Sequence, residues 1–335
     1  MRQESRLDRT LWTIVLVIAV AVVVVSFARQ PLLGGDSVAS GFSPPLTLWL
    51  AGSQSGGQAE AVAQQAATCW ESAGRPATVG VLPGSSSQAV GDFLDRVHSA
   101  PGDLLLITST TLSDIAHASA SAPFSAAGES AQRTVRLLTG AAPVAVLASD
   151  GLTLAVRTKS SVRNTAELLS LMRREADRPL LGVAESTWLQ GNLASLAQSA
   201  GLHGQVPYSV FRSSREAVMS LDAGEVEVIV APHSELRDQL REHRLRELPW
   251  PASRRATPRA WIAVIAPAGI SRAELATLRE QAQHLCAGHT WTRMLRGDGM
   301  SSTAVSKPQL ADFVRDDLGE ATRLQTLAAH IVRDY

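Results

Sequence analysis

Short apolar runs alternate with helix-spaced segments along the chain from residue 46 onward. Leu46, Leu48 and Leu50 recur at every second position, as they do in a buried strand. Residues 52–57 contain only glycine, serine and glutamine, and residues 59–66 then place alanine and valine at helical spacing. The pattern predicts a strand, a loop of small residues and a helix whose first N–H groups are available to an anion.

The same pattern of strand, loop and helix recurs along the rest of the chain. Capping residues predict helices after Asn164, Ser213 and Ser271, because each is followed by a glutamate three residues later. Such consecutive units predict two α/β domains with parallel sheets, whose ligands bind at the carboxyl ends of the strands. The further strands are predicted at residues 77–82, 104–107, 142–156 (two strands around Ser149-Asp150-Gly151), 180–184, 206–211, 226–230 and 261–266.

An apolar segment without charge, residues 11–28, is flanked by arginines. It is near the minimum length for a membrane span, and Ser26-Phe27-Ala28 is similar to a signal-peptide cleavage site. Residues 1–29 are therefore an uncleaved anchor, which the long valine run favours, or a signal peptide whose removal leaves a secreted or periplasmic protein. Either alternative places the rest of the chain at the extracytoplasmic side of the cell membrane. Residues 30–44 are rich in Gly, Ser and Pro and predict a flexible tether.

Composition narrows the range of functions. The 335-residue chain carries 31 basic and 31 acidic residues, so no basic excess indicates a nucleic-acid partner. Gln54 stands in the sequence GSQSG where a catalytic serine would be needed. The sequence also lacks a phosphate-binding glycine motif and a metal-ligand cluster. We therefore predict that the protein is not an enzyme and that it uses no cofactor and no metal.

The order of the loop motifs resembles that of the extracytoplasmic solute receptors of tripartite tricarboxylate transporters, the TctC or Bug type. Residues 56–64 are similar to the family's Gly-Gly-x-x-Asp-x-x-Ala-Arg motif, with Glu60 in place of the aspartate and Gln64 in place of the arginine. The resemblance covers the chain from about Pro45 to its C-terminus. The other similar stretches are PGSSS (83–87), GDLLLI (102–107), SVFRSS (209–214), AGEVE (223–227) and WIAVIAPAG (261–269).

The resemblance implies a two-lobed periplasmic-binding-protein fold of the Venus flytrap, type II-like, following the N-terminal transmembrane or signal helix. Lobe 1 would consist of residues 45–144 and 259–335, and lobe 2 of residues 145–258. The protein, expected as a monomer, would capture a small anionic solute of the carboxylate type in the cleft and deliver it to integral-membrane permease subunits. The alternative is a membrane-anchored sensory or accessory module that binds a ligand without a role in transport.

The candidate ligand-binding residues lie in the loops that follow the predicted strands, where hydroxyl, amide and backbone N–H groups could bind a carboxylate. Each loop could instead be a plain helix cap, and Arg215 is either a bidentate carboxylate partner or a surface arginine. Cys69 and Cys286 form a disulfide outside the cytoplasm or remain two buried thiols. The candidates are Ser55, Gly56, Gly57, Gln58, Ser85, Ser86, Ser87, Thr108, Ser186, Thr187, Trp188, Ser213, Ser214, Arg215 and His233.

Overall fold

The predicted N-terminal helix, residues 1–29, and the tether up to residue 43 lie outside the residues that the structure describes. In the described ranges, no helix is both long and apolar enough to cross a bilayer. The computed structural model describes residues 44–51, 57–95, 102–121, 124–174, 179–202, 206–251, 258–302, 316, 319–324 and 326–327.

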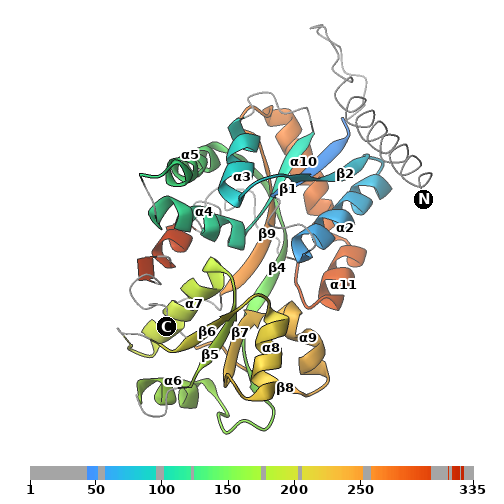
Figure 1. Ribbon diagram of the computed structural model, residues 1–335. Coiled ribbons are helices and arrows are strands. Elements are labelled where there is room, and N and C mark those ends of the chain that lie inside the picture. The colour runs from blue at the N-terminus through green and yellow to red at the C-terminus, as the bar shows by residue number, and fades with distance from the viewer. Residues whose placement is uncertain are drawn as a thin grey trace, which may run out of the picture. The chain divides into compact units, whose positions relative to one another are not determined.

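Three parallel strands form one end of the sheet, and helices connect them as the hydrophobic pattern predicts (Figure 1). β1 is the central strand, with Leu48 opposite Val79 on one side and Leu104 on the other. The apolar face of β1 packs against the first connecting helix, so the strand holds the start of that helix at the carboxyl end of the sheet. These elements are β1 (Leu46–Ala51), α2 (Gln58–Ser72), β2 (Ala77–Leu82), α3 (Ser86–Asp95) and β3 (Asp103–Thr108).

The chain leaves this end of the sheet through α4 (Ser109–Ser121), α5 (Ala126–Gly140) and one long strand, β4 (Ala142–Arg157). The prediction of two strands around Ser149-Asp150-Gly151 is wrong. These three residues pair with residues of β9 (Arg259–Ala266) in an antiparallel ladder, and the ladder holds a turn-like sequence extended. Figure 1 shows β4 and β9 running together from one half of the sheet into the other.

The second half of the sheet is mixed, which corrects the prediction of a separate parallel sheet. β5 pairs in parallel with β6 and β7, whereas β4 runs antiparallel to β7 and β8. The strand path is β2-β1-β3-β9-β4-β7-β5-β6, with β8 beside β4. The elements of this half are α6 (Thr165–Arg173), β5 (Leu181–Ala184), α7 (Thr187–Ser199), β6 (Tyr208–Phe211), α8 (Ser214–Ala223), β7 (Val228–Pro232), α9 (His233–Arg241) and β8 (Leu245–Leu248).

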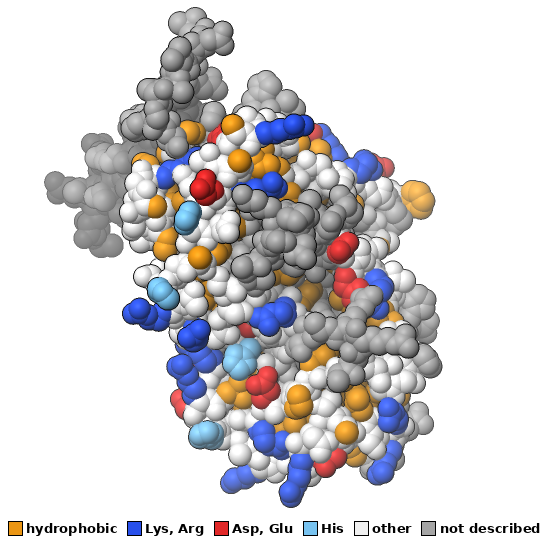
Figure 2. Space-filling model, turned by 180° about the vertical axis from the view of Figure 1, so that it is seen from behind, with side chains coloured by type: hydrophobic (Ala, Val, Ile, Leu, Met, Phe, Trp, Pro, Cys, Tyr) orange, Lys and Arg blue, Asp and Glu red, His pale blue; other side chains and the backbone are white. Residues whose placement is uncertain are grey.

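Four apolar clusters form the core, two on each half of the sheet. On the first half, α2 packs on one face together with α10 (Arg272–Ala287) and α11 (His289–Gly297), and α3, α4 and α5 cover the other face. On the second half, α6 and α7 cover one face, and α8 and α9 cover the other. On the face shown in Figure 2, basic and acidic side chains are interspersed over the described residues.

The predicted helix caps are confirmed. Asn164, Ser213 and Ser271 each accept a hydrogen bond from the backbone N–H of the glutamate three residues later. These local signals are reliable because the capping group and the N–H it binds lie within one turn. The division into lobes at residues 144/145 and 258/259 stays a prediction.

Candidate functional site

A cavity of about 290 Å³ lies beside the two long strands, where the starts of three helices meet. Its walls come from the first turns of α2, α4 and α9, from residues 148–150 of β4 and from residues 260–262 of β9. Cavities at the carboxyl ends of strands, where helices begin, are the usual ligand sites of α/β sheets. This cavity is therefore the candidate functional site.

The first backbone N–H groups of α2 lie at the cavity wall, and no acceptor is recorded for those of Gln58 and Ala59 among the described residues. Its N-cap residue, Gly57, has no side chain to cap them, and the first intrahelical bond is donated by Ala61 to the Gly57 carbonyl at 3.2 Å. The N–H groups of Gln58 and Ala59, both at the cavity wall, precede that bond. A 15-residue helix adds the positive end of its dipole at this point. The start of α2 can therefore bind an anionic group.

The start of α4 lies at the same cavity and is held by side-chain hydrogen bonds. The Thr108 hydroxyl accepts a bond from the Thr111 N–H at 3.1 Å, which caps the helix. The Ser109 hydroxyl accepts a bond from the Trp261 N–H at 3.3 Å, which fixes the helix start to β9. The first turn of α4 thus faces the cavity in a fixed position, next to the Trp261 ring.

Two carboxyl groups are also among the residues that line the cavity. Asp150 of β4 is 4% exposed, and burial raises its pKa to about 6. Glu235, in the first turn of α9, has an exposed side chain because it faces the cavity, yet desolvation by the surrounding protein raises its pKa as well. A carboxyl group with a raised pKa takes up a proton at a higher pH than an exposed carboxyl group does, and a nearby cation would lower its pKa again.

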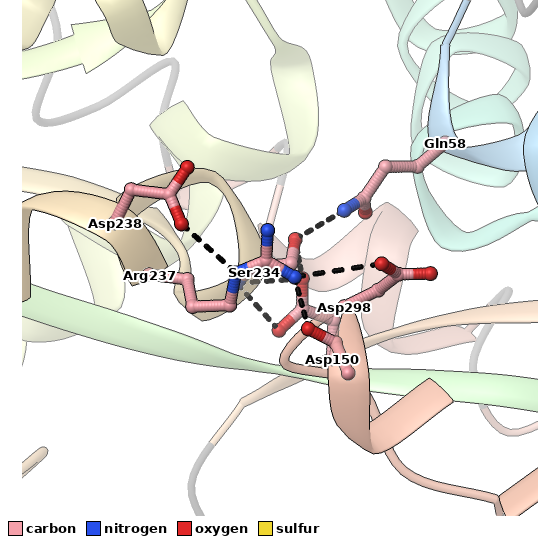
Figure 3. Close-up of polar contacts among 7 residues, drawn as sticks. Gln58, Asp150, Ser234, Arg237, Asp238 and Asp298 are labelled. Carbon is pink, nitrogen blue, oxygen red and sulfur yellow. Dashed lines mark hydrogen bonds and ion pairs between the residues drawn. The ribbon is translucent and has the colours of Figure 1, made fainter. Parts of the chain in front are cut away.

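A chain of hydrogen bonds joins α2 to Asp150. The Gln58 amide donates to the Ser234 hydroxyl at 2.5 Å, and that hydroxyl donates to the Asp150 carboxylate at 2.5 Å (Figure 3). The Ser234 N–H also donates to Asp150, at 3.3 Å, so Asp150 caps α9. The two halves of the sheet are therefore linked through Ser234.

A second link between the halves is centred on Asp114 of α4. The Thr187 hydroxyl, at the start of α7, donates to this carboxylate at 2.7 Å, and the Ser86 hydroxyl donates at 3.4 Å. Burial raises the pKa of Asp114, and these two hydrogen bonds oppose that rise. Two predicted site residues, Ser86 and Thr187, thus meet on an acid outside the predicted set.

Comparisons with solved structures give the fold. The chain is similar to MatC from Rhodopseudomonas palustris with bound malate (TM-score 0.59, 18% identity, 84% of this chain and 99% of that one). It is also similar to an R. palustris protein with adipate (TM-score 0.63, 18% identity, 86% of this chain and 98% of that one). A TctC solute-binding protein from Polaromonas is similar as well (TM-score 0.65, 15% identity, 85% of this chain and 98% of that one). The chain has the fold of the TctC-type solute-binding proteins. No protein-family model and no curated protein matches the chain by sequence.

The TctC-type fold brings only some of the predicted residues to the cavity. Gly57, Gln58 and Thr108 line it, whereas Ser55 and Gly56 lie outside the described residues. The remaining candidates lie at helix starts outside the cavity lining, and their contacts with a ligand stay predictions. They are Ser85, Ser86 and Ser87 at α3, Ser186, Thr187 and Trp188 at α7, Ser213, Ser214 and Arg215 at α8, and His233 at α9.

Several of these residues have a structural role in the TctC-type fold. Ser186 caps α7 and Ser213 caps α8. Trp188 is 6% exposed and packs in the core of the second half. Arg215 is exposed on α8, and the His233 ring contacts the Thr153 hydroxyl at 3.3 Å.

Two residues of the cavity wall, Asp150 and Glu235, are absent from the predicted set. Asp150 is the only charged residue between Arg136 and Arg157. A single acid in a long apolar run signals a buried polar group, so the sequence contained a clue to it. Glu235 carried no such signal, because an acid in the first turn of a helix normally serves the helix dipole.

The cysteines do not form the disulfide that was one of the two alternatives. Cys69 on α2 and Cys286 on α10 are free thiols, half-buried against the same apolar cluster. Burial raises the pKa of Cys286 to about 11. Among the described residues, no group of three or more His, Cys, Asp or Glu side chains is placed to hold a metal ion.

Proposed function

We propose that the protein is an extracytoplasmic solute-binding protein. Its cavity captures a small solute that carries a carboxylate group, and the protein delivers the solute to a membrane permease of the tripartite tricarboxylate type. The observation that carries this proposal is the meeting of two helix starts, those of α2 and α4, at one cavity between the two halves of a TctC-type fold.

The helix starts supply part of the binding free energy. An anion at one helix N-terminus gains about 0.3–1 kcal/mol at exposed sites, and up to about 2 kcal/mol when partly buried. Two helices therefore contribute about 2–3 kcal/mol to the binding of a carboxylate. Micromolar affinity needs about 8 kcal/mol, so hydrogen bonds and burial against Trp261 and Ile262 must supply most of the rest.

The structural neighbours support a small organic acid as the solute. One neighbour binds malate and another binds adipate. A cavity of about 290 Å³ is at the small end of ligand sites, which suits a solute of this size. The apolar segment at residues 11–28 supports a location outside the cytoplasm, where such receptors meet their solute.

The contacts between the two halves support capture by opening and closing. The bond from Gln58 to Ser234 and the bond from Thr187 to Asp114 span the halves. A net contribution of about 1 kcal/mol for each lets thermal motion break them. A bound solute that contacts both halves would then favour the closed form.

A thermal-shift panel of four- to six-carbon mono- and dicarboxylates, with and without amino or hydroxyl groups, tests the proposal on the full-length protein. A solute at 100 times its Kd stabilises the folded state by about 2.7 kcal/mol, which raises Tm by several degrees. The double variant Gln58→Ala/Thr108→Ala should reduce the shift, and Glu71→Gln on the far end of α2 should not. If no member of the panel raises Tm, the proposed function is wrong.

A further inference from the structure

We propose that the protein has a second ligand site, separate from the cavity beside β4 and β9, which binds a small amphiphilic anion. The ligand class is a molecule with an apolar body and one anionic head group, such as an aromatic carboxylate. The observation that carries this inference is a second cavity where two tryptophans lie together with hydrogen-bond donors that have no acceptor among the described residues. The inference does not depend on the proposed function.

The second cavity has a volume of about 510 Å³ and lies where the last turns of α2 and α10 meet the start of α11, three helices that can be followed in Figure 1. It shares no described lining residue with the first cavity. The first cavity lies at the start of α2 and the second at its end, so a helix of 15 residues, about 22 Å long, separates them. Its volume is within the range of small-molecule sites.

Apolar side chains form a large part of the wall of the second cavity. Trp70 of α2, Trp291 of α11 and Leu285 of α10 are among its lining residues. Aromatic rings pack favourably against other rings, and burial of apolar surface favours binding in proportion to the area removed from water. These walls therefore suit a ligand with an aromatic or aliphatic body.

Two buried donors at or next to this cavity have no hydrogen-bond partner among the described residues. The indole N–H of Trp291 donates to the Leu147 carbonyl at 3.1 Å, whereas the indole N–H of Trp70 has no acceptor. Arg75 is 4% exposed and donates from Nη1 to the lining residue Gln281 at 2.8 Å, while its Nη2 has no acceptor. Because an unpaired buried donor is costly, such groups mark a place where a ligand acceptor would be stabilised.

The start of α11 adds backbone donors to the same cavity. Its N-cap residue, Gly288, provides no side-chain cap, and the first intrahelical bond runs from the Thr292 N–H to the Gly288 carbonyl at 3.0 Å. The N–H groups of His289 and Thr290, both lining residues, precede that bond and have no acceptor recorded among the described residues. The positive end of the α11 dipole therefore lies at the cavity.

Backbone carbonyls at the cavity already accept hydrogen bonds. Those of Cys69 and Trp70 accept from the Ala73 N–H at 3.1 Å, and that of Leu285 accepts from the Gly288 N–H at 3.0 Å. Since the negative end of a helix dipole resides on unbonded carbonyls, these bonds weaken it at α2 and α10. No aspartate or glutamate is among the described lining residues. The cavity therefore offers donors without matching acceptors, and an anionic acceptor satisfies them better than a neutral one.

Isothermal titration of the full-length protein at pH 7.5 with three probes tests this inference. The probes are 1-naphthylacetate, its neutral counterpart 1-naphthylacetamide, and acetate, which has the head group without the apolar body. Naphthylacetate should bind about tenfold more tightly than the amide, because the donors and the helix dipole favour a full negative charge. Acetate should bind at least about tenfold more weakly than naphthylacetate, because it leaves the apolar walls uncovered.

Thr290→Glu is the deciding variant. An acid in the first turn of α11 is compatible with the helix, yet its charge at the cavity should weaken naphthylacetate binding about tenfold. The matched control Thr277→Glu places the same charge on the exposed side of α10, outside the lining, and should keep the affinity within about twofold of wild type. Trp70→Phe removes the indole N–H and should weaken binding about fivefold, with circular dichroism verifying that the variant is folded.

The first cavity supplies the second control. The double variant Gln58→Ala/Thr108→Ala should leave naphthylacetate binding within about twofold of wild type, because it changes only the first cavity. Thr290→Glu should likewise leave the Tm shift produced by the small carboxylates unchanged. This pair of results would assign the two ligands to separate sites.

The remaining outcomes overturn the second site and leave the proposed function standing. They are an absence of naphthylacetate binding, equal affinity for naphthylacetate and its amide, or equal effects of Thr290→Glu and Thr277→Glu. If only Gln58→Ala/Thr108→Ala weakens naphthylacetate binding, the probe occupies the first cavity and the inference is also wrong. A failure of the proposed function would instead appear as small carboxylates that produce no Tm shift, whatever naphthylacetate does.

Discussion

Replacement of Asp150 by asparagine should stabilise the unliganded protein at neutral pH. Burial raises the pKa of this carboxyl group from 3.8 to about 6. Each unit is about 1.4 kcal/mol, so the ionised carboxylate costs the fold about 3 kcal/mol. The sign follows from the direction of the shift: below pH 3.8 both states hold the proton and the cost is absent, and above about pH 6 it is complete. Asparagine keeps a group that accepts from Ser234 and carries no charge.

Urea unfolding at pH 4, 5, 6 and 7.5 measures this effect as the difference between variant and wild type. We expect Asp150→Asn to be within about 0.5 kcal/mol of wild type at pH 4 and about 2–3 kcal/mol more stable at pH 7.5. The control Asp92→Asn, on the exposed side of α3, should show no such trend. If Asp150→Asn is no more stable than wild type at pH 7.5, burial of the Asp150 carboxylate does not destabilise the fold, and the reasoning from its raised pKa is wrong.

Three further predictions address the link across the cavity, the backbone and the thiols. Gln58→Ala should weaken solute binding about fivefold in titration calorimetry, because the closed form loses about 1 kcal/mol; unchanged affinity would contradict this. Gly102→Ala should lower the free energy of unfolding by about 2 kcal/mol or more, because the φ of Gly102 is +99° and a Cβ there would lie 2.2 Å from the Pro45 carbonyl oxygen. In the control Gly269→Ala, the new Cβ has no atom within 4 Å, so the free energy of unfolding should remain within about 0.5 kcal/mol of that of wild type. Unfolded protein without reductant should react with iodoacetamide at both Cys69 and Cys286, and failure of both cysteines to react would reveal a disulfide. At pH 8, Cys286 should react more slowly in the folded protein than in the unfolded protein, because its pKa of about 11 leaves about one thiolate in a thousand.

The local physics of the chain was enough to predict much of the fold. The two-residue period of Leu46, Leu48 and Leu50 and the caps at Asn164 and Ser213 are confirmed, because a strand's face and a helix's first turn depend on neighbours within a few residues. The loop before α2 was recognised as a place for an anion on the same basis. Gly57 and Gln58 line the cavity, and their contact with a ligand stays a prediction.

The tertiary structure decided the other wall of the site. Ser149-Asp150-Gly151 has the composition of a turn, and only pairing with residues 259–261, more than a hundred positions later in the chain, holds it extended and buries Asp150. The meeting of Gln58, Ser234 and Asp150 likewise joins three distant segments. Sequence periodicity reports what a residue's near neighbours require, whereas the lining of the cavity depends on which distant side chains the sheet brings together and how far it removes them from water.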